Sequence, residues 1–214
     1  MSKLIAKLEK KFGRFAIPNL SLYMVILYGV GVLLSYVYPT LLDYFSLSVY
    51  YILRGQVWRL VTWIIIPEYH SNIFLAVISL LCFYMLGRNL ERAWGTFLFN
   101  FFVFMGSVFI VLGQFIAVGI SGLLTLASVL PAEYFYLMYV IGQGGTYYVY
   151  MSLFLAFAIT FPDARVLLMY IFPIRAKYIG IVYVILLGIE VLSVFSASVP
   201  HGFVILTQVF FSLL

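Results

Sequence analysis

A short apolar run from Thr146 to Thr160 limits most strongly what this chain can fold into. The run ends at Phe161-Pro162, where a proline stops the helix, and charged residues follow. A helix of about fifteen residues is roughly 22 Å long, which is shorter than the ~30 Å hydrocarbon core of a bilayer. Neighbouring helices must therefore surround it, and its ends can hold polar atoms below the membrane surface. The sequence predicts a helical bundle organised around this segment.

The composition is that of a membrane protein with several spanning helices. Of the 214 residues, 65% are hydrophobic and only 9% are charged, whereas soluble domains carry about 25% charged residues. The net charge of +5 therefore does not indicate nucleic-acid binding, and membrane lipids are the expected partners. We expect one transmembrane domain at 20–214, preceded by a cytoplasmic amphipathic segment at 1–19. The single Cys82 cannot form an intrachain disulfide.

An all-α polytopic bundle of six spanning helices is predicted. The expected helices are at 20–38, 73–88, 96–118, 145–160, 178–195 and 201–214. The beginning of the first loop, 41–53, is too apolar for water, and its tyrosines suit the outer headgroup level. The segment 123–141 is interrupted by Pro131 and Glu133, so we interpret it as an interfacial or re-entrant insertion. The segment 166–174 is too short to span and is expected along the cytoplasmic interface.

Basic residues predict the orientation of the bundle. With the N-terminus inside and six spans, all Lys and Arg residues except Arg54 and Arg59 fall on the cytoplasmic side. Counting 123–141 as another span would move Arg165, Arg175 and Lys177 to the outer side. Six spans therefore agree better with the excess of cations on cytoplasmic loops. Both termini are expected in the cytoplasm.

The N-terminal segment has the pattern of an amphipathic helix. The apolar residues Leu4, Ile5, Leu8, Phe12 and Phe15 recur on one side, and Lys3, Lys7, Lys10 and Lys11 occupy the other. Two compatible interpretations stay open. The segment is either a helix that lies on an anionic leaflet or a basic segment that only sets the topology.

Three motifs follow one another along the chain. They are Trp58-Arg59 in the first loop, Glu91-Arg92-x-x-Gly95 after the second helix, and Phe161-Pro162-Asp163-Ala164-Arg165-Val166 after the fourth. With these motifs in this order, the chain from 20 to 214 resembles the rhomboid superfamily. The resemblance implies a six-helix bundle with a half-submerged first loop. Trp58 and Arg59 either anchor that loop or are an ordinary interfacial tryptophan beside an arginine that reaches the headgroups.

The catalytic residues of rhomboid proteases are not matched. Counted back from Phe161-Pro162, the family's nucleophile falls at Tyr147, and a phenol with a pKa of about 10 is a poor nucleophile. The family's oxyanion His and Asn fall near Leu75 and Ser79, which do not reproduce those donors. The chain therefore resembles derlins and other pseudo-rhomboids, which implies binding of transmembrane protein clients without proteolysis or a cofactor. It also implies the plasma membrane for a bacterial chain, or the endoplasmic reticulum for a derlin-like eukaryotic one.

An active intramembrane serine protease is the alternative. Gly119-Ile120-Ser121-Gly122 matches the Gly-x-Ser-Gly nucleophile motif, and His201 followed by Gly202 resembles the family's catalytic histidine. Against this, Ser121 directly follows the third predicted helix and does not lead into Phe161-Pro162. With Tyr147 in place of a serine at the nucleophile position, His201 has no serine nucleophile to activate. A transporter or channel, the third class considered, would need paired ionisable residues inside the membrane.

Glu190 is an ionisable residue inside the fifth predicted helix. Such groups usually face protein or water, because charge is costly in the bilayer. Glu190 either lines a candidate pocket with Tyr147 and His201, or it is a structural partner of a tyrosine, Arg59 or His201, or a protonated acid. His70 has no second His or Cys at ligand spacing, so no metal site is expected.

Cysteine labelling tests the predicted orientation. In a Cys82→Ser background, cysteines at positions Phe12 and Arg175 should be protected from impermeant reagents on the non-cytoplasmic side of sealed membranes. A cysteine at Arg54, in the first loop, should react and serves as the control. Labelling at either of the first two positions would contradict the topology.

Overall fold

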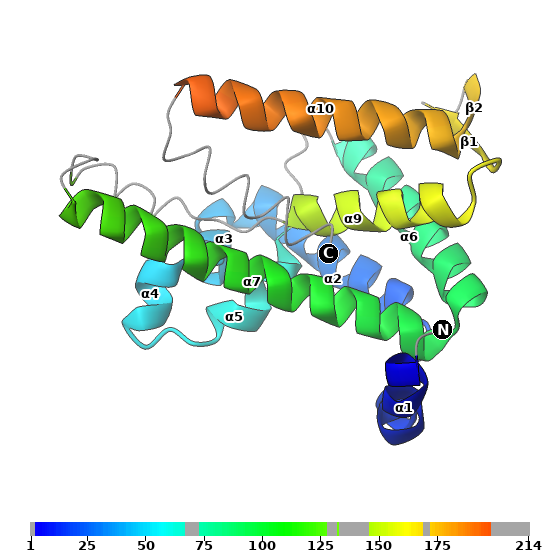
Figure 1. Ribbon diagram of the computed structural model, residues 1–214, viewed down its shortest axis with the longest axis horizontal. Helices are drawn as coiled ribbons and strands as arrows, with labels where there is room; N and C mark the ends of the chain where they lie inside the picture. Colours follow the sequence, from blue (N-terminus) through cyan, green and yellow to red (C-terminus); the bar gives the residue numbers. More distant parts are fainter. Residues whose placement is uncertain (1–2, 67–72, 128–131, 133–145, 169–171, 198–214) are drawn as a thin grey trace.

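The computed structural model describes residues 3–66, 73–127, 132, 146–168 and 172–197 (Figure 1). Its elements in chain order are α1 (Lys3–Phe12), η1 (Gly13–Phe15), α2 (Leu20–Val37), α3 (Pro39–Phe45), α4 (Val49–Leu53), α5 (Arg59–Thr62), η2 (Trp63–Ile65), α6 (Ile73–Trp94), α7 (Thr96–Leu126), α9 (Thr146–Thr160), β1 (Arg165–Leu168), β2 (Phe172–Arg175) and α10 (Ala176–Ala197). The chain is therefore mostly helical, as its composition predicts.

Three helices, α2, α6 and α7, are long and apolar enough to cross a membrane. Shorter apolar stretches lie in α9 and α10, at Val149–Thr160 and Ala176–Ile189. The prediction of a helical membrane protein is confirmed at this level. The sixth predicted helix, 201–214, lies outside the described residues, so the count of six spans stays a prediction.

The helix α9 is surrounded by other helices, as its length requires. It packs against α6, α7 and α10, and Leu153 near its middle is 1% exposed. An aromatic group joins it to α2 and α6: the Phe83 ring lies 5.2 Å from Tyr28 and 4.4 Å from Tyr150. Edge-to-face and tilted rings at these separations stabilise a core beyond the apolar area that they bury.

The third predicted helix was wrong in its end point. The helix α7 does not stop at Val118 but continues to Leu126 through the Gly-x-Ser-Gly string. Within it, Ser121 Oγ donates to Val118 O and Thr125 Oγ1 to Ser121 O. Small residues do not by themselves end a helix in an apolar setting, because every backbone group there needs an internal partner.

The first loop and the segment after α9 fold more regularly than predicted. The first loop contains the short helices α3 and α4, and Pro39 is the first residue of α3, a position where a missing N–H costs nothing. The strands β1 and β2 form an antiparallel hairpin in which Val166 pairs with Ile174. At its base Asp163 lies 3.5 Å from Arg175 and 3.2 Å from Lys177, exposed ion pairs that contribute little stability.

One end of the bundle collects several helix ends. The ends of α6 and α9 and the starts of α7 and α10 all lie at the right of Figure 1, and α1 lies below the turn from α6 to α7. We call this the junction end. Most of the basic residues described lie on these segments, including Arg14, Arg92 and Lys177. These segments are the ones that the charge count assigns to the cytoplasmic side, and that assignment stays a prediction.

Gly87 allows α2 and α6 to approach closely. A Cβ atom at Gly87 would lie 2.8 Å from the Ser21 Cβ, a separation that real side chains do not adopt. Gly106, in α7, has nothing within 4 Å of the same position. The two glycines therefore form a matched pair: Gly87 lies at a close contact between helices, and Gly106 faces open space.

Replacing Gly87 by alanine should destabilise the bundle by about 1–3 kcal/mol, because overpacking forces α2 and α6 apart. Gly106→Ala should be neutral or slightly stabilising, since alanine favours helix by up to about 1 kcal/mol over glycine. The measurement is the thermal unfolding midpoint of each variant in one detergent. Equal midpoints for the two variants would show that α2 and α6 are not in close contact at Gly87.

Candidate functional site

Arg59 is buried in the first loop and organises it. The side chain is 3% exposed. Its Nη1 donates to Asp43 O at 2.6 Å, to Ser46 O at 2.9 Å and to Ser46 Oγ at 3.1 Å, and its Nε donates to Gln56 Oε1 at 2.7 Å. The guanidinium also lies 4.6 Å from the centre of the Tyr51 ring. This is the geometry of a loop anchor, because the charge faces carbonyl oxygens and a ring rather than headgroups.

Burial lowers the pKa of Arg59 from its ordinary value, and the neighbouring Tyr51, Asp43 and Tyr44 oppose that shift. The guanidinium stays charged at neutral pH, since its ordinary pKa is so high.

Trp58 behaves differently from Arg59. It is 48% exposed, and its indole N–H donates to Tyr44 O at 3.4 Å. Its ring is thus free to lie at a membrane interface.

Glu91 connects the end of α6 to the start of α2. One carboxyl oxygen accepts the backbone N–H of Asn19 at 2.7 Å, and the other lies 3.4 Å from the Ser21 hydroxyl, which donates to it. Asn19 is the N-cap of α2, and its own side chain makes no cap hydrogen bond. In a capping box, a Glu or Gln in the first turn of the same helix accepts the N–H of the N-cap residue. Here Glu91, from a different helix, accepts it. A negative group at this end also favours the helix dipole.

Asn100 holds the chain just before α2. Its side-chain oxygen accepts the N–H of Ile17 at 3.0 Å, and its amide nitrogen donates to Ile17 O at 3.0 Å and to Thr96 O at 2.8 Å. The side-chain amide of Asn100 thus binds both the N–H and the carbonyl of Ile17. The sequence alone does not identify Asn100 as a site residue, because its partner Ile17 is distant in the sequence.

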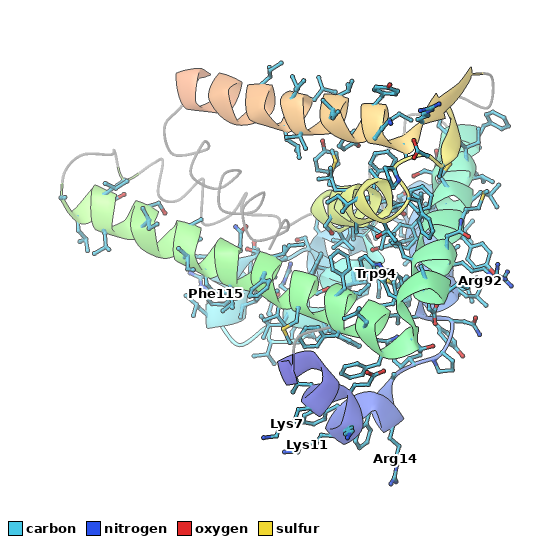
Figure 2. All side chains as sticks on the ribbon, turned by 45° about the vertical axis from the view of Figure 1, so that its right-hand side comes forward. Lys7, Lys11, Arg14, Arg92, Trp94 and Phe115 are labelled. Atoms are coloured by element: carbon cyan, nitrogen blue, oxygen red, sulfur yellow. The ribbon has the colours of Figure 1, made fainter. Side chains whose placement is uncertain are left out.

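Trp94 and Gly95 complete the connection at the junction end. The Trp94 indole N–H donates to Thr160 Oγ1 at 3.1 Å, which ties α6 to the last residue of α9. Gly95 is the single residue between α6 and α7 and has φ = 88°, a conformation that favours glycine. The motif Glu91-Arg92-x-x-Gly95 therefore joins four helices. Arg92 points away from the bundle at this end (Figure 2).

Tyr147 lies in the first turn of α9, as predicted. It is partly buried and packs against the main core and against a group formed by Met151, Leu155 and Leu187. The preceding Thr146 is 2% exposed, and its hydroxyl donates to the Ile66 carbonyl. The position expected for a nucleophile thus holds a packed phenol beside a threonine that fixes the start of the helix.

Other predicted site residues are placed in part. Ser121 is 1% exposed inside α7. The backbone of Glu190 belongs to α10, but its side chain is not among the described parts of the chain. His70 and His201 lie outside the described residues. Within the described ranges no group of three or more His, Cys, Asp or Glu could hold a metal ion.

An apolar groove of about 350 Å³ lies beside α9. It is lined by Trp94, Phe102, Ser152, Leu155, Ala156, Ile159 and Val184. The Phe102 and Trp94 rings meet edge to face at 5.4 Å and form one wall. The Ser152 hydroxyl donates to Val149 O in its own helix, so this side chain is already hydrogen-bonded. No sequence pattern predicts this groove, because its wall comes from four separate helices.

These features define a helical integral membrane protein with a buried polar junction and an apolar groove. The chain belongs to a family described as eukaryotic integral membrane protein (DUF1751), whose model matches residues 19–213. No curated protein and no solved structure matches the chain. Because the family is eukaryotic, the bacterial plasma membrane no longer applies as a predicted location. The endoplasmic reticulum stays a prediction.

Arg59→Ala should destabilise the protein by about 2–4 kcal/mol, because two buried acceptors of Ser46 and the partly buried Asp43 carbonyl lose a charged donor. Arg59→Lys should be intermediate, since an ammonium keeps the charge without the planar fork. Arg54→Ala is the control: Arg54 is exposed and contacts only the face of Tyr50 among the contacts described, at 4.0 Å. Thermal unfolding in detergent measures all three, and an Arg59→Ala variant as stable as Arg54→Ala would refute the anchor.

Proposed function

We propose that this protein is a rhomboid-like pseudoprotease that binds transmembrane segments of other membrane proteins without cutting them. The observation that carries the proposal is Tyr147, in the first turn of α9 and packed against the core. A phenol there is a poor nucleophile and fills space that a substrate carbonyl would need. Rhomboid-like motifs at Trp58-Arg59 and Glu91-Arg92 support the same interpretation.

The hydroxyl groups near these helices support a structural role. Ser121 donates to Val118 O at 2.8 Å, Ser152 to Val149 O at 2.9 Å, and Thr146 to Ile66 O. A catalytic serine instead needs its hydroxyl directed at a base and a substrate. The protease alternative requires Ser121 to exchange this bond for one with His201.

The groove beside α9 suits an apolar segment in the membrane. Its volume of about 350 Å³ is at the lower end of the range for binding sites. It therefore has room for a few side chains of a client helix rather than for the whole helix. Ile159, on its rim, is 79% exposed, so the groove is accessible from the side of the bundle. Close packing at such a groove drives helix association in membranes, where hydrophobicity alone does not.

Site-specific crosslinking tests client binding. A photoreactive residue at Ile159 should capture membrane proteins by way of their transmembrane segments. Val184→Trp should reduce the yield about tenfold, equivalent to ~1.4 kcal/mol, because the indole fills the groove. Val182→Trp is the matched control, since Val182 and Val184 lie on α10 with the same 53% exposure and only Val184 lines the groove. Equal capture in both variants, or adducts with lipid alone, would contradict the proposal.

Two further variants separate client binding from proteolysis. Ser121→Ala should capture clients as well as the native chain does, whereas Glu190→Leu should impair capture if Glu190 lines a client pocket. Loss of capture in Ser121→Ala with full capture in Glu190→Leu would favour the protease.

A further inference from the structure

The N-terminal arm, α1 with η1, is strongly basic and exposed. Lys7, Lys10, Lys11 and Arg14 are all exposed, and Glu9 is the only acid between residues 3 and 15. Lys7, Lys11 and Arg14 point away from the helical bundle (Figure 2). The arm therefore presents its charge to the surroundings rather than to the rest of the described chain.

The same arm exposes large apolar side chains. Phe12 is 46% exposed, Phe15 76% and Ile17 39%. In the described part of the chain α1 makes few contacts beyond the adjoining η1, so the bundle leaves this apolar side open. Leu8 and Phe12 share a helix face by their spacing, and Lys7 and Lys10 lie on the other side. Such a division between apolar and basic sides is typical of helices that lie in a membrane interface.

The arm is held close to the level where the chain enters the membrane. Ile17 is bonded to Asn100, and the N–H of Asn19 to Glu91. Leu20 then begins α2, which is long and apolar enough to span. These bonds leave only a short connection between α1 and α2. A bilayer surface is thus always within reach of the arm, whereas a soluble partner would have to be recruited.

We propose that α1 and η1 form an interfacial anchor for an anionic bilayer leaflet. The side chains of Leu8, Phe12 and Phe15 enter the boundary between headgroups and acyl chains. Lys7, Lys10, Lys11 and Arg14 bind the phosphate and carboxylate groups of anionic lipids. Charge complementarity selects this partner, because four exposed cations with one nearby acid favour a negative surface. The proposal depends neither on client binding nor on which face of the membrane the arm occupies.

The expected strength follows from the charge. Each basic residue near an anionic surface contributes about 1 kcal/mol, or roughly a fivefold change in the ratio of docked to undocked arm. Loss of two cations should therefore lower that ratio about 25-fold, and charge reversal should lower it further. Salt should weaken docking, because these interactions are screened beyond roughly 10 Å.

The test uses the full chain in vesicles of phosphatidylcholine, with or without phosphatidylserine. An environment-sensitive fluorophore is attached at Phe15→Cys in a Cys82→Ser background. With phosphatidylserine, its emission should shift to the blue and be quenched by nitroxide lipids, and salt should reverse both effects. Lys7→Glu with Lys11→Glu should abolish the shift. Arg88→Glu with Arg92→Glu is the matched control, because it makes the same charge change at the junction end but outside the arm. This variant should keep most of the blue shift. Phe12→Asp should weaken docking without unfolding the chain, because Phe12 is exposed.

Several outcomes would overturn the proposal. They are a fluorophore that stays in water with phosphatidylserine present, equal docking to pure phosphatidylcholine, and equal loss in the two charge-reversed variants. A blue shift without nitroxide quenching would show that the arm packs on protein instead, either on its own bundle or on a second copy.

Discussion

The rest of the structure depends on the hydrogen bonds that Glu91 makes to the start of α2. A helix start leaves backbone N–H groups without partners, and in a membrane protein water is scarce to satisfy them. Glu91 satisfies the N–H of Asn19 from another helix and thereby fixes where α2 begins relative to α6. Gly87, one turn earlier on α6, lets the two helices touch at Ser21. The hydrogen bond from Asn19 to Glu91 and the close contact between α2 and α6 at Gly87 therefore depend on each other.

The same motif positions the groove. Gly95 turns α6 into α7, and Trp94 binds Thr160 at the end of α9. Because α9 is short, a single hydrogen bond near its end restrains much of its length. Trp94 also forms one wall of the groove with Phe102. A displacement of α6 at Glu91 would therefore also move Trp94 and change the shape of the groove. This holds although Glu91 bonds to the start of α2 and Trp94 to the end of α9.

The sequence allowed the main elements to be predicted, but not the contacts that join them. The short helix at 146–160 was predicted from its apolar run and terminal proline, and Glu91 and Gly95 were noticed as a motif. Asn100 was missed, because an asparagine in an apolar run has no pattern that identifies a partner such as Ile17. The end of α7 was placed too early, because Gly119 to Gly122 was taken for a helix end when tertiary context extends the helix. The groove needs side chains from four helices, and no local pattern contains that information.

The described part of the bundle centre is a packed aromatic core. Tyr28 is fully buried, and its hydroxyl has no hydrogen-bond partner in the part of the chain that the structure describes. Phe83 and Tyr150 cover its ring from α6 and α9. Rings packed at these separations fill the space between α2, α6 and α9. Tyr147, one turn before Tyr150, is also packed against this core. The short α9 is therefore held on the inner side of the bundle by aromatic packing against α2 and α6, while its groove-lining residue Ile159 stays exposed on the outer side.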